Sequence, residues 1–207
     1  MTPLKKSLIL IFVVLLIDQA VKVWIKTNLM LGGEIHVFGN WFIVHFVENN
    51  GMAFGMELSW KFGKMVLSIF RIVAVVLIGW YLVKLSKNGA HQWLLYSVAL
   101  VFVGAVGNII DSVFYGVIFS DSYSQVATLF PAEGGYSSFL HGKVVDMLYF
   151  PIIKGTYPGW VPFKGGESFI FFRPVFNIAD SAITIGISII LIFQKRFFKD
   201  TVESVTK

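Results

Sequence analysis

Long apolar stretches alternate with more polar ones along the chain, and this alternation predicts the elements of the structure. Four apolar segments have the length of a bilayer-spanning helix, about 20 residues. They cover approximately residues 7–25, 64–83, 93–113 and 178–193. Two longer segments of mixed character lie between them, at about 26–63 and 114–175. The pattern predicts an all-α transmembrane fold, a four-helix membrane bundle, and we expect residues 1–207 to form a single integral membrane domain.

The first apolar segment has one feature of a secretory signal peptide, because Lys5 and Lys6 precede it. Asp18 and Lys22 follow its most apolar part directly, and no small-x-small cleavage pattern occurs there. More apolar segments come later in the chain. We therefore expect the first segment to be retained as a membrane helix.

The mixed segments contain their own local patterns. Residues 35–47 are rich in β-branched and aromatic side chains around Gly39-Asn40, which predicts a short β-hairpin. Its aromatic side chains suit a membrane interface. Residues 120–138 and 154–166 are rich in turn-forming residues and read as inserted loops in an extended outer segment. Such loops can form a lid or a partner surface, or can simply be tolerated.

Composition agrees with a membrane location. The chain has 207 residues, of which 56% are hydrophobic and 14% charged, and its mean hydropathy is +0.75. Soluble domains have about 25% charged residues. No cysteine occurs, which excludes a disulfide framework and thiol catalysis.

The net charge of +5 does not indicate a nucleic-acid partner, because the cations flank the apolar segments and form no single stripe. Positively charged residues near spans mark the cytoplasmic side. The flanking cations in question are Lys5, Lys6, Lys84, Lys87, Lys195, Arg196 and Lys199. We therefore predict that both termini are cytoplasmic and that the two mixed segments face the other side.

Polar residues inside the apolar segments are the candidates for chemistry, because a charge in hydrocarbon costs roughly 2.5 kcal/mol or more. Asp18 and Lys22 are four residues apart on one helical face, an arrangement that favours a salt bridge with a supporting or ligand-contacting role. Arg71 also needs a partner, which the sequence does not identify. Gly104 and Gly107 have the small-x-x-small spacing that lets helices approach closely.

Three more carboxylates stand at the ends of apolar runs. Asp111 follows Asn108 by three residues, and Asp180 follows Asn177 at the same spacing, although Asn177 also suits a helix N-cap. Asp146 follows a short apolar run of its own. The repeated Asn-x-x-Asp spacing favours one site shared by these carboxylates over independent helix caps.

Several chemistries are conceivable at such a site. The four histidines have no metal-ligand spacing and no Gly-x-Ser-x-Gly elbow occurs, so neither zinc nor serine catalysis is expected. Two carboxylates that share one proton can activate water and polarise a carbonyl, and the residues alone leave open which two do so. A proton-coupled transporter with Asp18, Asp111 and Asp180 as its relay is an alternative. Four spans without an inverted repeat disfavour the transporter. A noncatalytic membrane scaffold is a further alternative.

Read together, the polar blocks resemble one family, the lipoprotein signal peptidases (signal peptidase II), which are bacterial membrane aspartyl endopeptidases. The blocks appear in the family's order and span most of the chain. They are Asp18-x-x-x-Lys22, Asn49-x-Gly51-x-Ala53-Phe54, Gly107-Asn108-x-x-Asp111, Gly142-x-Val144-Val145-Asp146 and Phe176-Asn177-x-Ala179-Asp180-Ser181.

The resemblance implies residue roles and a fold. Asp146 and Asp180 become the catalytic pair. The implied support and substrate-binding residues are Asn49, Gly51, Asn108, Asp111, Asn177, Asp18 and Lys22. The implied fold is four transmembrane helices with a small extramembrane β cradle.

The resemblance also implies a reaction and its location. Family members cleave prolipoproteins before a diacylglyceryl-modified cysteine, without a cofactor or metal. The expected protein is a multi-pass monomer of the bacterial inner membrane, in contact with lipid. Its active site is expected near the outer, periplasmic face.

Two departures from the family pattern stand out. Ser112 occupies the position after Asp111 where the family usually has arginine, and Lys143 and Arg173 are candidates to replace that cation. The spacings around Asp146 are also longer than in the compact family pattern, because of the two inserted loops.

Overall fold

The structure is a computed structural model that describes residues 1–50, 63–171 and 173–197. Among these residues, four helices are long and apolar enough to cross a membrane. They are α1 (Pro3–Asn28), α2 (Gly63–Lys87), α3 (Gln92–Ile110) with its continuation, and α5 (Ile178–Phe197). The continuation of α3 is a π-helical turn (Asp111–Tyr115) followed by α4 (Gly116–Ile118). The predicted class, a helical membrane protein with a small β element, is confirmed.

Helices α1, α2 and α5 are longer than the apolar segments predicted for them, and the residues they add include polar ones. In α1, Pro3 stands in the first turn, and the Thr2 hydroxyl accepts a hydrogen bond of 3.3 Å from the backbone N–H of Lys5. Both features are typical of helix N-termini. Helix α2 is extended at its C-terminal end, where it continues past its apolar part to Lys87.

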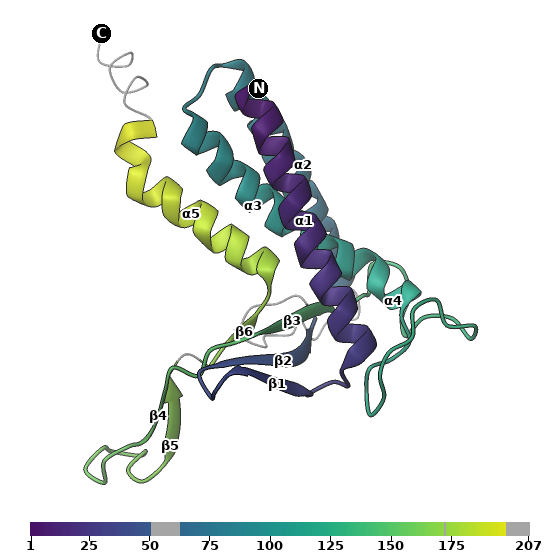
Figure 1. Ribbon diagram of the computed structural model, residues 1–207, viewed down its shortest axis with the longest axis vertical. Helices are drawn as coiled ribbons and strands as arrows, with labels where there is room; N and C mark the ends of the chain where they lie inside the picture. Colours follow the sequence, from purple (N-terminus) through teal and green to yellow (C-terminus); the bar gives the residue numbers. More distant parts are fainter. Residues whose placement is uncertain (51–62, 172, 198–207) are drawn as a thin grey trace.

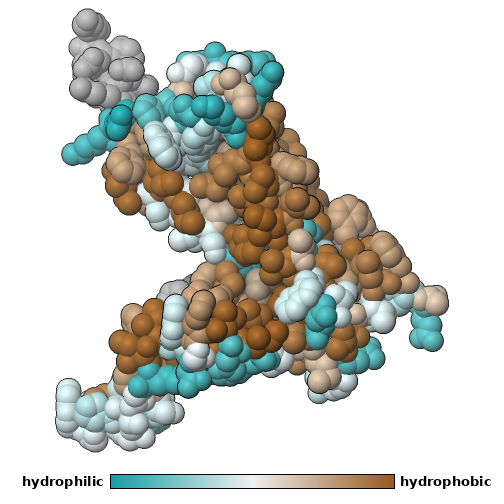
Figure 2. All heavy atoms as spheres, viewed as in Figure 1, coloured by the Kyte–Doolittle hydropathy of each residue, from teal (hydrophilic) through white to brown (hydrophobic). Residues whose placement is uncertain are grey.

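Figure 1 shows the N-terminal end of α1, the α2–α3 connection and the C-terminal end of α5 at one end of the bundle, with the β structure at the other. The helices carry apolar side chains on their outer surfaces, as the brown areas of Figure 2 show. Phe12 on α1, Phe70 on α2 and Ile192 on α5 are 65%, 68% and 72% exposed. This exposure is expected where lipid, not protein, covers a helix.

A four-stranded antiparallel sheet lies across the end of the bundle. Its order is β1 (Glu34–Phe38), β2 (Phe42–Asn49), β3 (Val144–Tyr149) and β6 (Val175–Phe176). The β1–β2 hairpin around Gly39-Asn40 confirms the hairpin predicted for residues 35–47. Strand β6 leads into α5 with only Asn177 between them, so the sheet continues directly into the last helix.

The two turn-rich loops have different structures. Residues 119–142 follow α4 as turns and bridges and pack back on the molecule, where the backbone N–H of Ala127 donates to the Lys26 carbonyl. Residues 154–166 contain most of β4 (Ile153–Thr156) and the turns that connect it to β5 (Ser168–Phe171), with which β4 forms a second, two-stranded sheet. The turn residues of that stretch predicted the loop over 157–166 but not the two strands that flank it.

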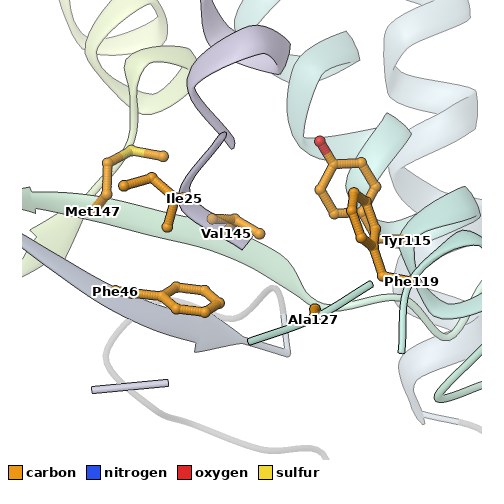
Figure 3. Close-up of a cluster of buried hydrophobic side chains, with 7 residues drawn as sticks. All are labelled: Ile25, Phe46, Tyr115, Phe119, Ala127, Val145 and Met147. Atoms are coloured by element: carbon orange, nitrogen blue, oxygen red, sulfur yellow. The ribbon is translucent and has the colours of Figure 1, made fainter. Parts of the chain in front are cut away.

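A buried apolar cluster fixes the sheet beneath the helices (Figure 3). It brings together α1, β2, the π-helical turn, the following loop and β3. Its members are Ile25, Phe46, Tyr115, Phe119, Ala127, Val145 and Met147. Because side chains alternate along a strand, Val145 and Met147 anchor β3 in this cluster while Asp146 points to the opposite face.

Two glycines allow α3 to lie against its neighbours. A Cβ at Gly104 would lie 2.2 Å from the carbonyl oxygen of Ala179 on α5. A Cβ at Gly107 would lie 2.7 Å from Oδ2 of Asp18 on α1. The predicted close helix approach at these positions is confirmed, and it brings α1, α3 and α5 together beside the sheet.

The first prediction concerns Gly104→Ala. The added methyl group meets backbone, which cannot rotate away, so we expect a loss of about 1–3 kcal/mol of stability and a Tm lower by roughly 2–12 °C. The measurement is thermal unfolding of the purified protein in detergent. Gly159→Ala is the control, because a Cβ there meets nothing within 4 Å. Equal Tm values for the two variants would contradict the close packing.

Candidate active site

Asp146 lies in the middle of β3 and is 3% exposed. The side-chain amide of Asn177 donates a hydrogen bond of 2.7 Å to its Oδ1. On β2, Asn49 stands opposite Val144, and its amide reaches diagonally to Oδ2 of Asp146 at 3.3 Å. Two amide donors, one on β2 and one in the connection between β6 and α5, therefore orient this carboxyl group.

Asp180 stands in the first turn of α5, where it forms a capping box with Asn177. The Asn177 side-chain oxygen accepts from the backbone N–H of Asp180 at 2.8 Å, and Oδ2 of Asp180 accepts from the backbone N–H of Asn177 at 3.4 Å. Such reciprocal bonds satisfy N–H groups that a helix start leaves unpaired. The expectation that Asn177 suits an N-cap is confirmed.

Asn177 connects the two aspartates because it uses both ends of its side chain. Its oxygen caps the helix that carries Asp180, and its NH2 group binds Asp146. The same NH2 group donates to the side-chain oxygen of Asn108 at 3.0 Å. Asn108 in turn donates to Oδ1 of Asp180 at 2.7 Å. Two asparagines thus bring both carboxyl groups into one hydrogen-bonded cluster.

A fully buried ion triad lies behind this cluster. The Lys22 ammonium is 3.0 Å from Oδ2 of Asp18 and 2.8 Å from Oδ2 of Asp111. It also donates to the side-chain oxygen of Asn108 at 3.0 Å. The predicted Asp18–Lys22 salt bridge is confirmed, and Asp111 is a second partner of the same lysine.

The two carboxylates of the triad, Asp18 and Asp111, each accept a hydrogen bond from the backbone next to one of the two central aspartates, Asp146 and Asp180. Asp111 accepts from the backbone N–H of Val145 at 3.2 Å. Asp18 accepts from the backbone N–H of Ala179 at 2.9 Å. Val145 and Ala179 each directly precede one of the central aspartates. Lys22 therefore stabilises two charged acceptors that fix β3 and the start of α5 relative to α1 and α3.

Gln19 and Tyr115 also belong to the hydrogen-bonded network around the ion triad, and neither is among the residues predicted from the sequence. The Gln19 amide donates to Oδ2 of Asp18 at 3.1 Å, to Oδ1 of Asp111 at 3.0 Å and to the Gly107 carbonyl at 3.2 Å. The Tyr115 hydroxyl donates to the Gln19 oxygen at 3.2 Å. The one available signal was the place of Gln19 beside Asp18 within an apolar helix.

Burial changes the acidity of Asp146. It raises the pKa of this carboxyl group, and the nearby charge of Asp180 raises it further, to about 7. The Asn49 and Asn177 amides act in the opposite direction because they stabilise the ionised form. Asp146 therefore holds a proton at pH values where an ordinary aspartic acid has lost it.

Lys143 and Arg173 are the predicted candidates to replace the missing arginine, and among the described residues neither forms a hydrogen bond or ion pair with Asp146 or Asp180. Ser112 lies in the π-helical turn, where its hydroxyl donates to the Asn108 carbonyl at 3.0 Å. Lys143 pairs with Glu48 at 3.0 Å, and Arg173 is exposed between β5 and β6. Arg71, which is half-buried on α2, interacts electrostatically with Asp180.

A second charged cluster supports the end of β2. The Glu48 carboxylate pairs with the buried Lys26 ammonium at 2.5 Å as well as with Lys143, and it accepts from the Ser122 hydroxyl at 3.1 Å. Burial alone would raise the pKa of Glu48, but the two lysines outweigh it and hold that pKa below its usual range. This cluster fixes the 119–142 loop beside the strand that carries Asn49.

The structure thus brings together most of the residues expected at the site. The central cluster contains Asp146, Asp180, Asn108, Asn177 and Asn49, and the ion triad contains Asp18, Lys22 and Asp111. Gly51 lies outside the described residues. Among the described residues, neither Asp146 nor Asp180 forms an ion pair within 4.0 Å, unlike Asp18 and Asp111.

The chain is similar to known membrane proteins over most of its length. A family profile described as Signal peptidase (SPase) II matches residues 10–196. A lipoprotein signal peptidase of Porphyromonas gingivalis is 52% identical over 188 residues, 90% of this chain and 81% of that protein. One from Amoebophilus asiaticus is 36% identical over 190 residues, 90% of this chain and 76% of that protein. A solved bacterial membrane enzyme, at 2.3 Å resolution, is 26% identical with a TM-score of 0.61, covering 95% of this chain and 90% of that one.

The second prediction concerns Lys22→Met. The substitution leaves two buried carboxylates facing each other without their cation, so we expect roughly 3–5 kcal/mol of destabilisation. Thermal and chemical unfolding in detergent measure it. Lys84→Met, at an exposed lysine near the end of α2, is the control with the same change in side chain. If both variants unfold alike, Lys22 does not hold the triad together.

Proposed function

The chain belongs to the signal peptidase II family, and on that premise we propose that Asp146 and Asp180 are its catalytic pair. The family consists of aspartic-type proteases that remove signal peptides from prolipoproteins, and the chain is accordingly a multi-pass membrane enzyme. The observation that carries the proposal is the double role of Asn177, which binds Asp146 and caps the helix of Asp180. That geometry suits two carboxyl groups that share a proton.

The surroundings of the two aspartates differ, and the difference suggests where the proton lies. Asp146 is buried, and its pKa is raised to about 7. Asp180 accepts hydrogen bonds from the Asn108 amide and from a backbone N–H at a helix N-terminus, where negative charge is favoured. In the resting enzyme we place the proton on Asp146 and the negative charge on Asp180.

The proposed reaction follows from that distribution. Asp180 accepts a proton from water, whose oxygen attacks the carbonyl carbon of the scissile peptide bond, while Asp146 gives its proton to the carbonyl oxygen. The tetrahedral diol then collapses and the C–N bond breaks. Asp180 gives its proton to the leaving nitrogen, and one diol hydroxyl returns a proton to Asp146. Both carboxyl groups end in their starting states.

Asn49, Asn108 and Asn177 have a positioning role in this scheme, together with the ion triad of Asp18, Lys22 and Asp111. The asparagines hold the two carboxyl groups in place, so their geometry need not be acquired when the substrate binds. Preorganisation of this kind contributes a large part of enzymatic rate enhancement. Gly51 keeps its proposed substrate-binding role from the family motif.

The position of the site suits a lipid-modified substrate. Figure 2 shows a hollow that opens sideways between α5 and the sheet, and Asp180 and Asp146 come from these two elements. We propose that the substrate enters there with its acyl chains still in the bilayer and is cut before the diacylglyceryl-modified cysteine. Each buried methylene contributes about 0.8 kcal/mol to anchoring.

Orientation in the membrane follows from the ends of the helices. The cation-rich ends of α1, α2 and α5 lie together, opposite the sheet (Figure 1). By the positive-inside rule we place both termini in the cytoplasm and the site near the outer face of a bacterial inner membrane. One chain supplies all residues of the proposed site, so we propose a monomer in contact with membrane lipid, and no nucleic-acid partner.

The third prediction tests the catalytic pair. Asp146→Asn and Asp180→Asn each remove a proton-transferring group, so each should abolish release of the signal peptide from a diacylglyceryl-modified precursor in bilayers. Asp111→Asn should retain part of the activity, because Asp111 acts through the backbone. Asp121→Asn, in the 119–142 loop and exposed, is the matched control and should be fully active. Cleavage by either of the first two variants at the normal rate would refute the assignment.

The fourth prediction concerns pH. The reaction needs the proton on Asp146, so kcat/KM should fall as pH rises through about 7. Asn49→Ala removes a donor that stabilises ionised Asp146, which raises its pKa further. The alkaline limb of the profile should therefore move to higher pH, by roughly half a unit to one unit. The control is Asn28→Ala, on the exposed end of α1. A limb that stays in place, or moves to lower pH, would contradict the role of Asn49.

A further inference from the structure

The β4–β5 hairpin is a part of the molecule that the proposed peptidase reaction does not use. Among the described residues, its two strands form a sheet separate from the four-stranded one. A two-stranded hairpin alone is marginally stable in water, and it usually needs a surface that covers one of its faces. The hairpin therefore raises the question of what covers it.

The register of the strands gives the hairpin two unlike faces. Ile153 pairs with Phe171, and Gly155 pairs with Phe169, so these side chains lie on one face. The Tyr157 ring packs on Phe169 with centroids 4.8 Å apart and extends that face. The other face carries Lys154, Thr156 and Ser168, with Ile170 as its apolar exception. One face is thus aromatic and aliphatic, and the other is largely polar.

Large apolar side chains of the hairpin and its base are open to the surroundings. Trp160 is 81% exposed and Phe163 102% exposed in the connection between the strands. At the base, Ile152 and Phe171 are each 60% exposed. A water-exposed hairpin would gain nothing from these residues, whereas tryptophan and phenylalanine next to lysine are typical of a membrane interface.

The place of the hairpin in the fold agrees with an interfacial position. Figure 1 shows it extending obliquely from the sheet, to one side of the helix bundle and away from the helix ends. On the membrane orientation proposed above, on which this inference rests, the outer boundary of the bilayer runs past this end of the helices. Lys154, Lys164 and Arg173 outnumber the single acid Glu167 here, and their charges complement lipid phosphates.

We propose that the β4–β5 hairpin is a lipid-binding arm that lies on the outer leaflet beside the helix bundle. Its apolar face and tip enter the boundary between headgroups and acyl chains, and its lysines contact the phosphates. The long Lys154 and Lys164 side chains can reach the headgroups from either face of a thin hairpin. This arm would fix the height of the sheet, and hence of the site, relative to the bilayer surface.

The absence of cysteine from the chain makes a direct test possible, since any single introduced cysteine can be labelled uniquely. Trp160→Cys and Phe163→Cys place a nitroxide label at the tip of the arm. Tyr123→Cys is the control, because Tyr123 is an equally open aromatic residue, 75% exposed, in the 119–142 loop. All three positions lie on the surface, so the labels disturb no packed core.

The fifth prediction concerns these labelled full-length proteins, reconstituted in vesicles of phosphatidylethanolamine and phosphatidylglycerol. Collisional relaxation by oxygen reports lipid, and relaxation by a water-soluble nickel chelate reports water. Labels at 160 and 163 should be accessible to oxygen and protected from nickel, and the label at 123 should show the reverse. Water-like readings at 160 and 163 would overturn the proposal and point to a protein partner for the hairpin. Lipid-like readings at all three positions would also overturn it, because the arm would then not be distinct.

This measurement uses no substrate, so it is independent of the catalytic assignment. A functional consequence is measurable as well. Trp160→Ser with Phe163→Ser should raise KM for a diacylglyceryl-modified peptide in bilayers and leave kcat unchanged, since the pair acts on position and not on chemistry. A lower kcat with unchanged KM would contradict a role in membrane positioning.

Discussion

The buried Lys22 ammonium is the interaction on which the site depends. Two carboxylates in an apolar interior repel each other and lose hydration, and a single cation between Asp18 and Asp111 offsets both costs. Each of these carboxylates accepts a hydrogen bond from a backbone N–H, one next to Asp146 and one next to Asp180. The lysine also binds Asn108, which orients Asp180 directly. One charge thereby links helices α1, α3 and α5 to strand β3.

Sequence reasoning reached the local parts of this arrangement and not the long-range ones. The four helices, the β1–β2 hairpin and the Asp18–Lys22 pair follow from hydropathy, turn residues and helical spacing. The bond from Ala179 to Asp18 joins residues 161 positions apart, and no local pattern reveals it. The same holds for Gln19, whose three acceptors come partly from α3. The choice of Asp146 and Asp180 came from family motifs, since three boundary aspartates looked alike.

The surroundings of the site connect its chemistry to the bilayer. A peptidase for lipid-modified proteins has to bring water, two carboxyl groups and acyl chains together at one boundary. Here the carboxyl groups lie where α5 meets the sheet, and apolar helix surfaces continue from that junction. Burial at this point, together with the charge of Asp180, raises the pKa of Asp146 to about 7, so in the proposed reaction the same location supplies both lipid access and a proton donor.

The central claim is that two carboxyl groups share one proton, with Asp146 as its holder. The most direct measurement is a carbon-13 NMR titration of the aspartate side-chain carboxyls of the protein in lipid, with the Asp146 signal assigned by its loss in Asp146→Asn. We expect this signal to titrate near pH 7 and the Asp146 carboxyl to stay protonated at pH 5. An Asp146 carboxyl already fully ionised at pH 5, as in an ordinary exposed aspartate, would contradict it.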